Sequence, residues 1–220
     1  MALPESERLP EVAVYVQARE VLEREGIPFM VGGGHAVAAY GHRRATKDID
    51  FILLAEHAEP ALRALERERF FVRRSDPRWL YQAMRGEVLV DLVFASCTHR
   101  GIVPVTRDWL DCARRKAVAG HTFPVIAPEE LIGQKILAQH EDRLDWWDAE
   151  RLLADRRRVD WQRILRVCAI DPVKTLSFLL FVEARHPNDG WYPREVLRQV
   201  WEAAAAELKL TLPGEPVAVG

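Results

Sequence analysis

Two aspartates, Asp48 and Asp50, have the residue type and spacing that most directly indicate chemistry in this sequence. Successive side chains of a β-strand point to opposite faces, so the two carboxylates share one face while Ile49 and Phe51 take the other. Neighbouring carboxylates repel each other, and a divalent cation is the simplest group that reverses the sign of that interaction. The pair therefore predicts a site for a divalent metal ion, Mg²⁺ or Mn²⁺.

A glycine turn precedes the aspartates. Gly32, Gly33 and Gly34 follow the apolar segment 29–31 and come directly before His35. Glycines free backbone N–H groups at the start of a helix, where the helix dipole favours phosphate. A phosphate-binding turn beside a pair of metal ligands predicts an enzyme that handles nucleoside triphosphates such as ATP.

These motifs together resemble those of a known superfamily. A glycine pair, a helix and then Arg-x-Thr-x-Asp-x-Asp, residues 44–50, are similar to the nucleotidyltransferases of DNA polymerase beta type, and most similar to the AbiEii-type and related toxin nucleotidyltransferases. In those families Ser or Thr usually follows the second glycine, whereas this sequence has the bulkier and less adaptable imidazole of His35. The resemblance implies nucleotide contacts from Gly33, Gly34, His35, Arg44 and Thr46.

Asp91 interrupts the apolar segment 89–94. A lone buried carboxylate is unfavourable unless it is paired or binds a metal ion. The resemblance implies that Asp91 is the third acid of the superfamily, which shares a metal ion with Asp48 and Asp50 and takes the proton from the attacking hydroxyl. The alternative is an edge strand from which Asp91 faces water.

Lys135 lies in the segment 128–138, which we expect to be a helix. At 100° per residue it falls between Leu131 and Ile132 on the apolar face, and an inward lysine needs an anionic partner. The resemblance implies that Lys135 approaches the nucleotide phosphates. The alternative is a lysine whose stem covers the core while its ammonium group reaches solvent.

Asp145 and Asp148 belong to the segment 143–153, which resembles the last motif of the same families. In that motif the second acid supports the active site, and this implies a role for Asp148, which lies one turn before Leu152 at the border of an apolar stripe. For Asp145 the alternative to a role in this motif is that it only caps the helix.

Composition narrows the class of protein. The chain has 220 residues, which indicates one domain or one domain with a small appendage, and a hydrophobic fraction of 49% is enough for a substantial core. A net charge of −2 does not indicate nucleic-acid binding. The three cysteines are far apart, so no zinc ribbon or disulfide framework is predicted. Without a signal core or a long apolar run, we expect a cytoplasmic protein with no membrane partner.

The elements that must position these residues alternate first and then become helical. We expect helices at 11–25, 34–40 and 60–69, and strands at 29–31, 48–54, 70–73, 80–85 and 88–94, with a second hairpin at 117–126. Further helices are expected at 128–138, 145–154, 160–168, 171–185 and 193–208. The predicted fold class is α/β (α+β): a small mixed-sheet nucleotidyltransferase domain at 1–127, a helical domain at 128–210 and a loose tail at 211–220.

The resulting hypothesis is magnesium-dependent transfer of a nucleoside monophosphate from a nucleoside triphosphate to a hydroxyl acceptor. The toxin resemblance implies RNA, often a tRNA 3′ end, or a protein hydroxyl as acceptor, and a cognate antitoxin as partner. Two alternatives stay open: a small-molecule acceptor, as in aminoglycoside-modifying relatives, and a catalytically silent nucleotide-binding module. His35 and Leu89, where the toxin-like families commonly have Lys, favour the silent module, whereas the three acids argue against it.

Overall fold

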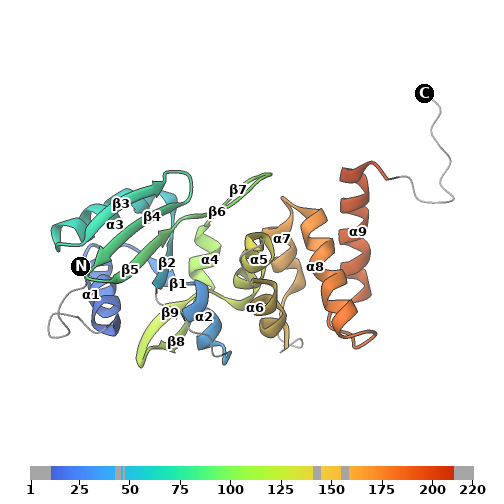
Figure 1. Cartoon of the computed structure of the whole chain (residues 1–220), viewed down its shortest axis with the longest axis horizontal. Helices are drawn as coiled ribbons and strands as arrows, with labels where there is room; N and C mark the ends of the chain where they lie inside the picture. The colour runs from blue at the N-terminus through green and yellow to red at the C-terminus, as the bar shows by residue number, and fades with distance from the viewer. Residues whose placement is uncertain (1–10, 43–45, 47, 141–144, 155–158, 211–220) are drawn as a thin grey trace. The chain divides into compact units, whose positions relative to one another are not determined.

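The computed structural model describes residues 11–42, 46, 48–140, 145–154 and 159–210. The chain divides into two compact units, Met1–Leu131 and Ile132–Gly220. The predicted fold class is confirmed, because the first unit contains a mixed sheet with helices and the second is helical (Figure 1). The expectations for Arg44 and for the tail 211–220 fall outside the described residues.

Within the described residues, seven strands form the main sheet, in the order β3-β4-β5-β2-β1-β9-β8. Strand β2 is parallel to β5 and β1 is parallel to β9, whereas the other neighbours are antiparallel. The strands are β1 Phe29–Val31, β2 Asp48–Leu53, β3 Phe71–Asp76, β4 Leu80–Arg85, β5 Val88–Val93, β8 Arg114–Val118 and β9 His121–Val125.

One face of this sheet is buried beneath two helices, α1 (Glu11–Arg24) and α3 (Ala55–Arg67), which contact each other and the strands β3 to β5 (Figure 1). The strands place Ile49, Phe51 and Val90 on the buried face, and all three are fully inaccessible to solvent. Burial of such side chains is the main favourable term for the unit. The short helix α2 (Gly33–Ala39) contacts β2 and β8 instead.

Tight turns set the register of two hairpins. A two-residue turn at Gly86, where φ is +62°, pairs Arg85 with Val88. The β8–β9 turn has positive φ at both Ala119 and Gly120, the geometry that matches the twist of the strands. The spacing of side chains along these hairpins therefore follows directly from the positions of the turns.

Some element boundaries differ from the sequence expectations. Helix α3 was expected to begin at Pro60, because proline suits a first helical position. It begins at Ala55 instead, and Pro60 lies inside it. The hairpin of β6 (Ala95–Thr98) and β7 (Gly101–Pro104) and the helix α4 (Arg107–Asp111) were not predicted. All three are too short to show a hydrophobic period.

The second unit contains the end of α5 (Pro128–Ala138) and the helices α6 Asp145–Leu152, α7 Trp161–Cys168, α8 Pro172–Arg185 and α9 Arg194–Leu208. As expected, Asp171 caps α8 by accepting a hydrogen bond from the backbone N–H of Lys174. A Cβ at Gly133 would lie 2.6 Å from the side chain of Val167, so α5 and α7 are in close contact. No helix in the described ranges is long and apolar enough to cross a membrane.

Candidate active site

The three aspartates lie on one face of the central strands. Asp50 is paired with Asp91 across the parallel strands β2 and β5, and Asp48 with Leu89. Paired residues project to the same side of a sheet, and residues two apart on a strand share a face. Asp48, Asp50 and Asp91 therefore share the half-buried face. The edge-strand alternative for Asp91 is wrong, because β5 lies between β4 and β2.

Asp91 is held by a polar neighbour on the next strand. Gln82 Nε2 donates a hydrogen bond to Asp91 Oδ1 at 2.9 Å, and the Ser75 hydroxyl donates to Gln82 Oε1. Burial raises the pKa of Asp91; the bond from Gln82 lowers it, and nearby Asp48 raises it. A carboxylate with a raised pKa beside other acids is suited to accept a proton. The sequence analysis missed Gln82, although counting outward from the Gly86 turn pairs it with Asp91.

The glycine turn lies directly against this face. Gly33 has a φ of +55°, and a Cβ there would lie 1.8 Å from Asp50 Oδ2, so a larger residue does not fit. A Cβ at Gly34 would lie 3.0 Å from the side chain of Thr46. The Thr46 hydroxyl in turn donates to Asp48 Oδ1 at 2.9 Å. The structure thus brings together Gly33, Gly34, Thr46 and the two aspartates of β2.

His35 lies beside Tyr15 of α1, with the two rings edge to face and their centroids 5.1 Å apart. His35 Nε2 and the Tyr15 hydroxyl oxygen are buried, and neither has a hydrogen-bond partner among the described residues. Burial lowers the pKa of His35, against the opposite effect of Asp48 and Glu11. Burial, Glu11 and Asp48 raise the pKa of Tyr15 to about 12. Two neutral polar groups therefore lie within the electrostatic reach of Asp48, and the sequence analysis treated Tyr15 only as a core residue.

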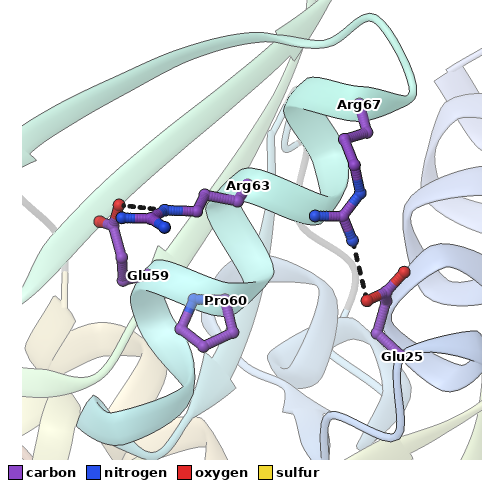
Figure 2. Close-up of a pocket in the computed structure, with 5 residues that line it drawn as sticks. All are labelled: Glu25, Glu59, Pro60, Arg63 and Arg67. Atoms are coloured by element: carbon purple, nitrogen blue, oxygen red, sulfur yellow. Dashed lines mark hydrogen bonds and ion pairs between the residues drawn. The ribbon is translucent and has the colours of Figure 1, made fainter.

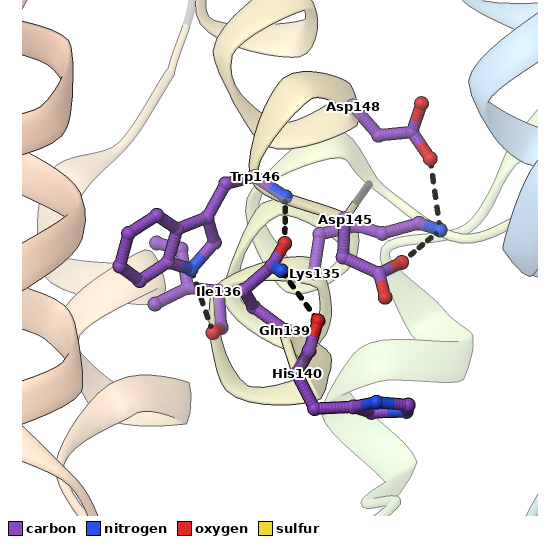
Figure 3. A network of polar contacts seen from close by, with 7 residues as sticks. All are labelled: Lys135, Ile136, Gln139, His140, Asp145, Trp146 and Asp148. Atoms are coloured by element: carbon purple, nitrogen blue, oxygen red, sulfur yellow. Dashed lines mark hydrogen bonds and ion pairs between the residues drawn. The ribbon is translucent and has the colours of Figure 1, made fainter. Parts of the chain in front are cut away.

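Lys135 and Asp148 belong to the second unit. Lys135 Nζ lies 2.7 Å from Asp145 Oδ1 and 3.0 Å from Asp148 Oδ2 (Figure 3). Lys135 is 5% exposed, Asp145 0% and Asp148 2%, so the ammonium group does not reach solvent and the alternative of a solvent-directed lysine is wrong. Asp145, for which helix capping was the alternative, is the first residue of α6 and binds Lys135.

The donor set of the aspartate face suits a hard cation. Among the described residues, no three His, Cys, Asp or Glu side chains converge closely enough to enclose a metal ion. Magnesium is usually bound by one or two carboxylates together with substrate phosphates rather than by a cage of protein groups. Asp48 and Asp50, beside the glycine turn, fit an ion that binds together with a nucleotide, and a shared ion at Asp91 stays a prediction.

A surface depression of about 330 Å³ lies elsewhere, along α3, and is lined by Glu25, Glu59, Pro60, Arg63 and Arg67 (Figure 2). Its charged side chains pair with each other: Arg63 Nε lies 2.9 Å from Glu59 Oε1, and Arg67 Nη2 lies 2.8 Å from Glu25 Oε2. Helix α3 covers the sheet face opposite to the aspartates. The depression is therefore not part of the candidate active site.

Residues 11–169 match the family described as "Nucleotidyl transferase of unknown function (DUF2204)". No curated protein matches. Among solved structures, an antigenic nucleotidyltransferase-like protein from Paracoccidioides brasiliensis is 18% identical, with a TM-score of 0.51 over 86% of this chain and 91% of that one. The antibiotic-resistance factor ANT(2'')-Ia is 15% identical, with a TM-score of 0.47, and the match covers 90% of this chain and 95% of that one. The lincosamide antibiotic adenylyltransferase LnuA, with lincomycin bound, is 15% identical, with a TM-score of 0.46, and the match covers 70% of this chain and 99% of that one.

The chain belongs to this nucleotidyl transferase family and is an enzyme of the nucleotidyltransferase class. The superfamily that the motifs indicated is thereby confirmed. The AbiEii-type subfamily and its toxin-antitoxin setting stay predictions.

The buried ion pairs of Lys135 give the first testable prediction. Lys135→Met keeps most of the apolar stem but leaves two buried carboxylates without their cation, so we expect a loss of about 3–5 kcal/mol in the free energy of unfolding. Urea denaturation measures this loss. Adding Asp145→Asn and Asp148→Asn removes the uncompensated charges and restores part of the stability. An unchanged urea midpoint in Lys135→Met would contradict the burial of the pair.

Tyr15 gives a prediction in which a substitution stabilises the protein. Its hydroxyl oxygen is buried without a partner, and such a group is unfavourable by about 1–3 kcal/mol. Tyr15→Phe should therefore raise the melting temperature of the nucleotide-free protein in a calorimetric scan. Tyr192→Phe is the matched control, because its hydroxyl donates to Glu183 Oε2 at 3.0 Å and its removal should lower the melting temperature.

His35 makes stability depend on pH. Its pKa in the folded protein lies below the ordinary value of 6.5, so the unfolded chain binds more protons near and below that pH. The stabilisation is complete above pH 6.5 and is lost as the pH falls from there toward the folded pKa. We expect His35→Gln to flatten the fall of the urea midpoint below pH 6.5. Parallel profiles for the two proteins would show that His35 is not responsible.

Proposed function

We propose that this member of the nucleotidyl transferase family transfers a nucleoside monophosphate from a nucleoside triphosphate to a hydroxyl acceptor and releases pyrophosphate. One observation carries the proposal: Asp48, Asp50 and Asp91 share a face of the sheet, and Gly33 lies against Asp50. Like charges placed so close together are unfavourable unless a cation binds between them. The three aspartates and the glycine turn together suit a triphosphate with its metal ion.

In this proposal Asp48 and Asp50 hold magnesium, or manganese, which when bound neutralises charge on the triphosphate. Gly33 and Gly34 direct backbone N–H groups toward the β- and γ-phosphates, because the first N–H groups of a helix have no partner within it. Thr46 fixes one oxygen of Asp48 through its hydroxyl, which limits the rotation of that carboxylate. Binding and orientation of the triphosphate thus depend on the segment from Gly33 to Asp50.

Asp91 acts on the acceptor. The acceptor hydroxyl loses its proton to the Asp91 carboxylate, its oxygen bonds to the α-phosphorus, and the bond from that phosphorus to the bridging oxygen breaks. Gln82 holds one oxygen of Asp91 and leaves the other available for the proton. The raised pKa of Asp91 brings its proton affinity closer to that needed at neutral pH.

Lys135 and Asp148 keep their predicted roles in the proposal, with Lys135 neutralising phosphate charge and Asp148 supporting it. The contact of Lys135 with two carboxylates supports the second of these roles, since it fixes the position of the ammonium group. Arg44 keeps its predicted contact with the nucleotide.

The proposal is tested by incubating the protein with each labelled nucleoside triphosphate, magnesium and a panel of acceptors that includes total tRNA, protein and an aminoglycoside. Asp91→Asn should lower kcat by about 10²–10⁴-fold, the usual contribution of a general base, without lowering the melting temperature. Asp108→Asn, an exposed acid in the first turn of α4, is the control and should keep full activity. Removal of divalent ions with a chelator should abolish transfer. Binding of a nucleotide without transfer to any acceptor would favour the silent-module alternative, and a protein that neither binds nor transfers a nucleotide would contradict both.

A further inference from the structure

The sheet face that carries the aspartates extends across β5, β4 and β3 toward the edge of the sheet. Each residue pairs with the one directly opposite on the next strand, so cross-strand rows can be followed from the aspartates to the edge. The first row is Asp48, Leu89, Met84, Phe71, and the second is Asp50, Asp91, Gln82, Arg73. The hydrogen bond from Gln82 to Asp91 agrees with this order.

The first row is apolar and exposed beyond Asp48. Phe71 is 68% exposed and Met84 is 39% exposed, and they are direct cross-strand partners. Leu89, half-buried, joins them to Asp48. Contiguous exposed apolar side chains on a folded protein commonly mark a binding surface, and this row ends at a proposed active-site residue.

The second row ends in a positive charge at Arg73. Arg73 is exposed and has no carboxylate partner within the described part of the chain. Its neighbour Arg74 points to the other face, where it contacts Glu59 of α3. The two arginines therefore have different surroundings, and only Arg73 offers its charge on the face of the aspartates.

In-line displacement places the acceptor on this side of the site. The entering oxygen and the leaving pyrophosphate lie on opposite sides of the α-phosphorus. The glycine turn, which suits the β- and γ-phosphates, lies at β2 against Asp50. In the proposed reaction the acceptor hydroxyl then approaches over β5, at Asp91, and the next strands on the side away from the glycine turn are β4 and β3.

We propose that Phe71, Met84, Leu89 and Arg73 form the acceptor-docking surface and that the acceptor is the 3′ end of a single-stranded nucleic acid. This inference rests on the proposed function. A nucleobase stacks on Phe71 and Met84, and a phosphate pairs with Arg73. Strands lie about 4.8 Å apart, so Arg73 is about 10 Å from the strand of Asp91, within reach of a phosphate near the reacting hydroxyl.

The chemical step is the same as in the proposed reaction. The 3′-oxygen bonds to the α-phosphorus, its proton passes to Asp91, and the bond between the α-phosphorus and the bridging oxygen breaks as pyrophosphate leaves. The nucleic acid is lengthened by one nucleotide for each nucleoside triphosphate that is consumed.

Two readouts test the docking surface in the full-length protein. The first is fluorescence anisotropy of a labelled single-stranded RNA at several salt concentrations, and the second is extension of the same RNA with a labelled nucleoside triphosphate. Phe71→Ala should weaken RNA binding about tenfold and raise the KM for RNA with little change in the KM for the nucleotide. Arg73→Gln should weaken binding. It should also reduce the magnitude of the slope of log affinity against log salt concentration by about 1, the change expected for the loss of one phosphate contact.

Matched controls separate the docking surface from general effects. Arg74→Gln removes the same charge from the opposite face of β3, and Trp201→Ala removes a 40% exposed aromatic side chain from α9 in the second unit. Both should leave RNA binding and extension unchanged. Because Phe71 and Arg73 are exposed, their variants should keep the melting temperature of the wild-type protein.

Three results would overturn the inference. RNA binding that is equal in the wild-type protein and both surface variants would show that these residues are not the docking surface. Transfer to a protein or an antibiotic, but not to RNA, would show that the surface takes another acceptor while leaving the proposed function intact. A wild-type protein that neither binds nor transfers a nucleotide would remove the inference and the proposed function together.

Discussion

Asp50 and Asp91 lie directly opposite each other on neighbouring parallel strands, an arrangement of like charges that by itself destabilises a sheet. The surrounding structure is built in a way that tolerates it. Ile49, Phe51 and Val90 on the reverse side are fully buried, so the strands cannot shift by one residue without exposing this core. The packing of the opposite face therefore holds the two carboxylates next to each other, and a bound cation would reduce their repulsion.

The local part of this arrangement could be predicted from the sequence. A period of two residues is sufficient to place Asp48 and Asp50 on one face, and an isolated acid among apolar residues is sufficient to single out Asp91. The hairpin register at Gly86 was also within reach. The parallel pairing of β2 with β5 was not, because the partners are separated by a helix and a hairpin and no local pattern fixes a parallel register.

Burial of charge was the harder property to predict. The sequence indicated that Lys135 faces inward, but it offered both a solvent-directed ammonium group and a ligand phosphate as explanations. The structure provides Asp145 and Asp148, which come from the next helix, so the burial of the ammonium group is explained by partners within the chain. For Tyr15 the sequence explained only part of the side chain. A periodic apolar stripe accounts for its ring, but the buried hydroxyl, which has no hydrogen-bond partner among the described residues, can be recognised only from the structure.

The two-residue turn at Gly86 has a consequence for how this family can vary. Strand β5 is fixed by its pairing with β2, so one inserted residue in the turn would reverse the sides of every residue on β4. Gln82 and Met84 would then point into the helix-covered interior, and the buried Ala83 would face the aspartates. Substitutions on the exposed strands change the chemistry of this surface gradually, whereas a change in loop length replaces the whole surface at once. Diversity among homologues should therefore arise at β3 and β4 by substitution, with the length of this turn held constant.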